Sequence, residues 1–152
     1  MKPLIAIVIL AAAAGCDSST PAAPPTTGGA KGEPERLRVL HVLVAFRGAE
    51  RAADTVTRTQ DEAEVLAKEI LARAQRGEDF KNLIKDYSSD PGEGNYALVN
   101  HGVVARGPEI RRSTFVPAFT KVAFSLAIGD VGLAPFDKKD SPFGYHVIKR
   151  IE

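Results

Sequence analysis

Two histidines, His41 and His146, are the residues of this chain whose type and spacing point to chemistry. They lie about a hundred residues apart, each inside a short apolar run, residues 37–44 and 144–151, that has the character of a β-strand. Because side chains alternate between the two faces of a strand, each imidazole shares its face with apolar neighbours. The imidazoles meet only if the two strands are neighbours in one sheet. They then either form the floor of a pocket and tune its charge, or serve as core histidines that hold the fold.

The elements between these strands determine what covers the two histidines. A capping box, Thr-Gln-Asp-Glu at 59–62, predicts a helix that starts there and ends at Gly77. A shorter helix is predicted at 80–87, and a third starts at Pro117, a residue that a first helical turn tolerates. Residues 100–114 have no regular pattern. The predicted strands lie at 37–44, 96–99, 131–136 and 144–151, and the order β-α-α-β-α-β-β indicates an α+β fold.

Composition and charge exclude several classes of protein. The 152 residues, 44% hydrophobic and 26% charged, are typical of one ordinary globular domain. Twenty Lys and Arg residues balance nineteen Asp and Glu residues without a basic block, so we expect no nucleic acid partner. Three histidines and a single cysteine show no metal-ligand spacing, so neither a metal nor another cofactor is expected. His101 falls in the irregular segment and is expected on the surface.

The N-terminal segment has the pattern of an exported, lipid-anchored protein. Residues 1–15 have a short positive start and an apolar run too short to span a bilayer, as in a signal peptide. The small residues before Cys16 resemble the lipobox of bacterial lipoproteins, in which the cysteine is acylated. Residues 16–35 then form a flexible linker to a domain at 36–152. We therefore expect a location in the cell envelope, anchored to a bacterial membrane on its periplasmic side or at the cell surface. The alternative is an ordinary signal peptide with an incidental cysteine.

Five sequence blocks, in order, resemble the parvulin, or rotamase, family of peptidyl-prolyl cis-trans isomerases. They are Leu-His-Val-Leu-Val at 40–44, Thr-Arg-Thr-Gln-Asp-Glu-Ala at 57–63, Gly-Glu-Asp-Phe at 77–80 through Tyr-Ser-Ser-Asp-Pro-Gly at 87–92, Phe-Val-Pro-Ala-Phe at 115–119 through Ala-Phe-Ser-Leu at 123–126, and Phe-Gly-Tyr-His-Val-Ile at 143–148. Each block alone is weak, but all five occur with suitable spacing. The resemblance covers residues 37–152.

This resemblance implies a particular fold and site. The fold is an FKBP-like, four-stranded antiparallel sheet surrounded by about four helices, with a shallow peptide groove. The family's catalytic positions correspond to His41, Asp90 and His146, although Asp90 alone reads as a turn residue that stops a helix. The pocket for the proline ring corresponds to Tyr96, Phe115, Val116 and Phe119, of which the two phenylalanines, spaced i and i+4, also suit a helix core.

The implied function is isomerisation of X-Pro bonds in unfolded or exported polypeptides, without covalent catalysis. One alternative is a catalytically weak or inactive parvulin-like chaperone that binds clients while tethered to the membrane, and another is a structural domain in an envelope assembly. Two departures from the family pattern bear on this choice. Residues 92–97 lack the usual Gly-Gly-Asp-Leu-Gly run, and residues 100–114 replace a brief turn with an insertion that could narrow or cover the groove.

Overall fold

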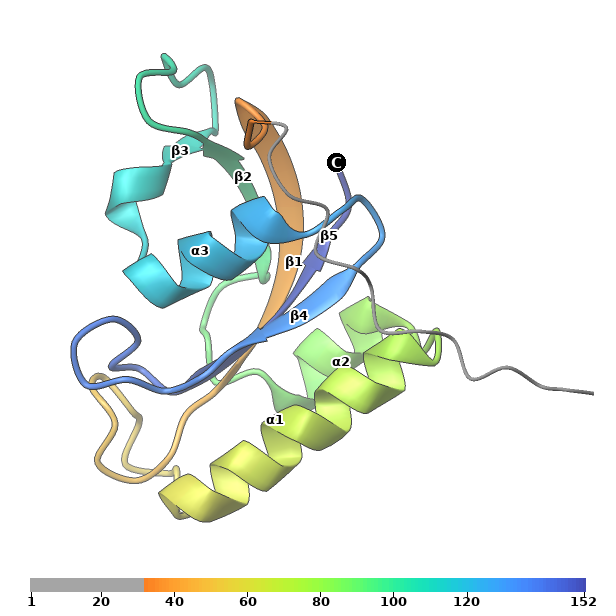
Figure 1. Cartoon of the computed structure of the whole chain (residues 1–152). Coiled ribbons are helices and arrows are strands. Elements are labelled where there is room, and N and C mark those ends of the chain that lie inside the picture. Colours follow the sequence, from red (N-terminus) through yellow and green to blue (C-terminus); the bar gives the residue numbers. More distant parts are fainter. Residues whose placement is uncertain (1–31) are drawn as a thin grey trace, which may run out of the picture. The chain divides into compact units, whose positions relative to one another are not determined.

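The computed structural model describes residues 32–152, which form a five-stranded sheet with helices on both faces (Figure 1). The strand order is β3-β2-β1-β5-β4. The predicted signal peptide, Cys16 and the linker up to residue 31 lie outside the described residues. Among residues 32–152, no helix has the length and apolarity needed to cross a bilayer. The elements are β1 (Arg36–Val44), α1 (Gln60–Gln75), α2 (Phe80–Tyr87), β2 (Asn95–Val99), β3 (Ile110–Arg111), the 3-10 helix η1 (Arg112–Thr114), α3 (Pro117–Ser125), β4 (Val131–Ala134) and β5 (Tyr145–Arg150).

The first and last strands, β1 and β5, are antiparallel neighbours, which confirms the prediction that they share a sheet. His41 lies opposite Ile148, and Leu43 lies opposite His146. The two histidines are therefore diagonal neighbours on the same face, a spacing that long or aromatic side chains bridge.

The two faces of β1 bury different parts of the core, because successive side chains point to opposite sides. Val42 and Val44 pack with α1 and α2, whereas Val39 packs with α3. Figure 1 shows α3 on the face opposite to α1 and α2. His41 shares the α3 face, so the histidine pair lies between the sheet and α3.

The observed helix ends follow the local signals in the sequence. Thr59 caps α1 with both bonds of the capping box, and Pro117 occupies the first turn of α3. Gly77, two residues beyond α1, has a φ of +91° that few other residues adopt. These local signals therefore set where the helices that cover the sheet begin and end.

The sheet and helix counts differ from the expected four antiparallel strands and about four helices. A fifth strand, β3, pairs in parallel with β2, and residues 32–152 contain three α-helices and one 3-10 helix. Both β3 and η1 arise from the irregular segment 100–114. The predicted strand 131–136 ends at Ala134, since Pro135 has no N–H to donate to a strand ladder.

Candidate functional site

The side chains of His41 and His146 meet beneath α3. His146 Nδ1 lies 3.3 Å from His41 Nε2. Both residues are buried, with His41 4% and His146 5% exposed. Within residues 32–152 the remaining ring nitrogens, His41 Nδ1 and His146 Nε2, have no hydrogen-bond partner. The buried pair therefore leaves two polar ring nitrogens without hydrogen bonds, which lowers the stability of the fold and calls for an explanation.

A carboxylate extends this pair toward the solvent. Asp90 Oδ2 lies 3.5 Å from His41 Nδ1 and accepts a hydrogen bond from the Tyr96 hydroxyl at 2.7 Å. The other carboxylate oxygen accepts from the Gly92 amide at 2.9 Å. The result is a continuous polar chain from Tyr96 through Asp90 and His41 to His146.

Two serines bring Asp90 to the edge of β1. β2 pairs with β1 only as far as Leu40, so beyond it the edge of β1 that faces away from β5 is open to other partners. Ser88 Oγ accepts from the Leu43 amide at 3.2 Å, and the Ser89 amide donates to the Leu43 carbonyl at 2.7 Å. Asp90 follows directly and thereby lies beside His41. Serine hydroxyls just after a helix are the sequence signal for this arrangement, although periodicity does not reveal it.

One glycine allows the next turn to approach His41 closely. The His41 amide donates to the Gly94 carbonyl at 2.7 Å, and Gly94 has a φ of +62°. A Cβ atom there would lie 2.5 Å from the His41 carbonyl oxygen. The shortened turn at 92–97 therefore still seats Tyr96 next to Asp90.

Burial keeps both imidazoles neutral. It lowers the pKa of His41 to about 4, against the opposing attraction of the Asp90 carboxylate. Burial, together with the neighbouring His41, lowers the pKa of His146 to about 3. Burial alone would raise the pKa of Asp90, but the bonds from Gly92 and Tyr96 and the nearby histidines hold it below its usual value.

The carboxylate also selects the histidine tautomers. An ionised Asp90 favours the proton on His41 Nδ1, so His41 Nε2 accepts from His146 Nδ1. His146 Nε2 is then an unprotonated acceptor. The arrangement contains one charge, on Asp90, backed by two oriented neutral dipoles.

Stability should fall as the solution is acidified from pH 7 to pH 5. The folded pKa of His41, about 4, lies below the unfolded value of 6.5, so the unfolded state binds the proton first. The free energy of unfolding is highest above pH 6.5 and decreases as the pH falls towards 4. Between pH 7 and pH 5, His41 alone accounts for a decrease of about 2 kcal/mol. Urea unfolding at the two pH values measures it. His41→Gln should weaken the dependence, of which the part due to His146 remains, and His101→Gln at an exposed position is the control. An unchanged slope in His41→Gln would contradict the assignment.

Aromatic rings form the wall beside the polar chain. Phe119 meets both imidazoles edge-on, at centroid distances of 5.3 Å to His41 and 5.5 Å to His146. Phe115 stacks on Phe119 at 5.0 Å, and Tyr96 meets Phe115 edge-on at 5.3 Å. Phe119 is only 1% exposed and so forms the floor, while Phe115 and Tyr96 are partly exposed and present ring surface to a ligand.

All seven side chains that the sequence assigns to the site line one cavity of about 700 Å³, here called the main groove. These are His41, Asp90, Tyr96, Phe115, Val116, Phe119 and His146. Of the insertion 100–114, only Thr114 contributes to its lining, so this segment does not roof the groove. The volume suits a small apolar ring with its flanking peptide groups.

Several residues that line the main groove were not assigned to the proline site from the sequence, including Leu43, Ser89 and Arg51. Arg51 has a φ of +58°, uncommon for a residue other than glycine, and its guanidinium carbon lies 5.2 Å from the centre of the Phe143 ring. Neither the left-handed backbone nor this contact leaves a periodic signal in the sequence.

Comparisons with known proteins show which family this chain resembles in sequence. A family model described as the PPIC-type PPIASE domain matches residues 26–152. Foldase protein PrsA of Geobacillus kaustophilus is 37% identical over 87 residues, covering 57% of this chain and 27% of the relative. Chaperone SurA of Chromohalobacter salexigens is 31% identical over 130 residues, covering 81% of this chain and 25% of the relative. This chain thus spans about a quarter of the length of the curated relatives it matches.

Solved structures show the same fold. Peptidyl-prolyl isomerase ESS1 from Candida albicans superposes with a TM-score of 0.58 at 23% identity, covering 78% of this chain and 63% of that one. The solution structure of TbPIN1 gives a TM-score of 0.55 at 23% identity, covering 78% and 98%. With the family model matching most of its length, the chain belongs to the PPIC-type peptidyl-prolyl isomerase, or parvulin, domain family.

Proposed function

We propose that this protein is a peptidyl-prolyl cis-trans isomerase that assists the folding of exported polypeptides. The observation that carries the proposal is the main groove, where an aromatic wall adjoins the hydrogen-bonded carboxylate of Asp90. The Phe115 ring and Val116 would hold the proline ring while the preceding carbonyl rotates. No covalent step is needed, because the barrier of about 18–20 kcal/mol comes from amide resonance alone.

The charge arrangement favours the twisted amide over the planar one. Resonance places partial negative charge on the carbonyl oxygen of the planar form, and twisting removes it. A carboxylate beside that oxygen, Asp90, therefore destabilises the planar state more than the twisted state. Catalysis needs only this difference in binding between the two states. The neutral histidines would orient Asp90 rather than touch the client, since both are buried.

A prolyl isomerisation assay tests the proposal. The full chain in mild detergent should accelerate cis-trans exchange of a short Ala-Pro peptide, followed by exchange NMR. Phe115→Ala should reduce the acceleration by removing the partly exposed ring of the wall. Lys138 is exposed and does not line the main groove, so its alanine variant serves as a control. Equal exchange rates with and without protein would refute isomerase activity.

The second candidate function is that of a client-binding chaperone. The burial of both histidines supports this alternative. His41 and His146 line the main groove but are only 4% and 5% exposed, so their network could hold the fold without assisting rotation. A chaperone of this kind would suppress client aggregation, and Asp90→Ala would leave that suppression unchanged while Phe115→Ala weakened it. Loss of exchange activity in Asp90→Ala would instead favour the isomerase.

We further propose that Cys16 is lipidated and anchors the domain in the cell envelope. The support is the sequence pattern of residues 1–16 alone. A labelled fatty acid should be incorporated into the protein in a bacterial host, and Cys16→Ser should abolish the label. A soluble secreted product from the unaltered gene would contradict the anchor.

A further inference from the structure

A second groove of about 800 Å³ adjoins the main groove and is called the side groove here. Phe115 and Pro117 line both grooves. The side groove follows α3 through Lys121 and reaches Arg112 in η1. A polypeptide with its proline in the main groove would reach the side groove by passing over Phe115 and Pro117.

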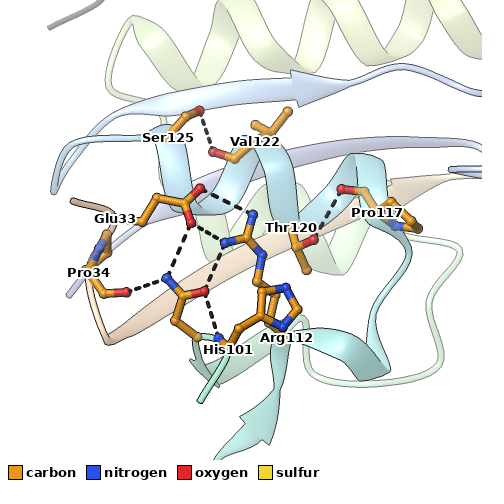
Figure 2. A network of polar contacts seen from close by, with 9 residues as sticks. Glu33, Pro34, His101, Arg112, Pro117, Thr120, Val122 and Ser125 are labelled. Carbon is orange, nitrogen blue, oxygen red and sulfur yellow. Dashed lines mark hydrogen bonds and ion pairs between the residues drawn. The ribbon is translucent and has the colours of Figure 1, made fainter. Parts of the chain in front are cut away.

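Arg112 in the side groove is already bound to a carboxylate. Its Nη1 donates to Glu33 Oε2 and, at 3.0 Å, to Asn100 Oδ1, while Nη2 donates to Glu33 Oε1 at 3.3 Å. Figure 2 shows the two dashed contacts between the Glu33 carboxylate and the guanidinium. The guanidinium carbon also lies 4.4 Å from the centre of the Phe124 ring, and the Arg112 side chain is only 14% exposed. This guanidinium is fixed in an orientation that suits two-point binding of a carboxylate.

Glu33 indicates which kind of ligand fits. It lies in the irregular segment that precedes β1, and the Asn100 side chain donates to the carbonyl of the next residue, Pro34, at 3.1 Å. The Glu33 side chain is 48% exposed, so it can leave Arg112 without opening the core. Arg112 thus already holds a carboxylate carried by a non-helical, irregular stretch of polypeptide.

Resting on the proposed isomerase function, we propose that Arg112 and the side groove form a carboxylate-binding subsite for client residues that flank the proline. Glu33 occupies this subsite from within the same chain when no client is bound. An acidic client residue displaces it. The protein should therefore prefer clients with acidic residues beside the proline, and Glu33 weakens this preference because it competes for Arg112.

The other charged side chains of the side groove carry both signs. Lys121 lines the same groove as Arg112, and so do Asp137 and Asp140. Asp137 Oδ1 accepts from the backbone amides of Lys139 and Asp140 within its own turn. The two carboxylates at 137 and 140 belong to the loop before β5, whereas Arg112 belongs to η1. An acidic side chain would therefore pair with Arg112 in η1 rather than with the loop that carries Asp137 and Asp140.

Opposite shifts in two single variants test the proposal. The probes are fluorescent Ala-Pro peptides with long flanks that carry either several Glu or several Gln residues, and the full chain is titrated by anisotropy. The ratio of the two affinities is the readout, because a general loss of stability affects both peptides alike. Glu33→Gln should raise the preference for the Glu peptide by about fivefold, since it removes the competitor. Arg112→Gln should reduce the ratio to about one, and Arg112→Lys should retain part of it.

A merely structural Glu33–Arg112 ion pair predicts that both variants change the ratio in the same way or leave it unaltered, and either result would overturn the subsite. Thermal unfolding of each variant verifies that it is folded. A short Ala-Pro peptide without flanks, followed for cis-trans exchange, separates the two hypotheses. If it is not isomerised, the enzyme assignment fails, while the affinity ratio of the long peptides still decides the subsite.

Discussion

Phe119→Ala should lower the free energy of unfolding by about 3–5 kcal/mol, the usual cost of removing a fully buried phenylalanine. Phe119 is 1% exposed and packs with Val39, Ile148 and Ala123 between α3 and the sheet. Its ring also holds both imidazoles edge-on, so the cavity would open directly beside the histidine pair. We expect a lower urea midpoint together with altered histidine ring signals in ¹⁵N NMR.

Phe124→Ala is the matched control for this prediction. Phe124 lies on the same helix, is 3% exposed and belongs to the same core cluster, but it does not line the main groove. It should therefore lose a comparable amount of stability while the histidine signals stay close to those of the parent protein. If Phe119→Ala left the histidine signals unaltered, Phe119 would be an ordinary core residue with no part in ordering the site.

The central part of the fold was predictable because it depends on periodicity. The alternation of apolar residues around His41 and His146 set which face each imidazole occupies, and a register on the same face then brings them together. Helix ends were readable from Thr59 and Gly77, where a cap or a left-handed turn is chemically required. These signals are local, so a single sequence contains them.

The parts that sequence reasoning missed depend on contacts between distant residues. Strand β3 is two residues long and exists because it pairs with the end of β2, a register that no local pattern encodes. Arg36 binds Glu109, and Arg112 binds Glu33, across separations of 73 and 79 residues. Such ion pairs fix the insertion 100–114 away from the main groove. Charged residues in an irregular segment do not reveal their partners in advance.

The position of Asp90 lies between these cases. Its sequence, before Pro91, indicates a turn, and the structure shows that turn. Its placement beside His41 depends on Ser88 and Ser89 bonding to the edge of β1, which is a tertiary contact. Only the resemblance to a family connected this turn with the histidines, and its role in the reaction stays a prediction.

Asp90→Asn should reduce kcat/KM for a short Ala-Pro peptide by about tenfold, which corresponds to roughly 1.4 kcal/mol of transition-state stabilisation. Asparagine has nearly the same shape, and its amide oxygen can still accept from Tyr96 or Gly92, so the turn should persist. The charge beside the rotating carbonyl is lost, and with it the bias against the planar amide. Peptide affinity should change little, because the wall formed by Phe115 is intact.

Tyr96→Phe separates charge from hydrogen bonding at the same carboxylate. It removes the donor at 2.7 Å but leaves Asp90 ionised at pH 7, since Gly92 still donates to the other oxygen. We therefore expect a smaller loss of kcat/KM than in Asp90→Asn. If the two variants lost activity equally, or if Asp90→Asn kept full activity, the carboxylate charge would not drive catalysis. The polar chain would then serve to hold β1, β5 and the Ser88–Asp90 turn together, as the chaperone alternative requires.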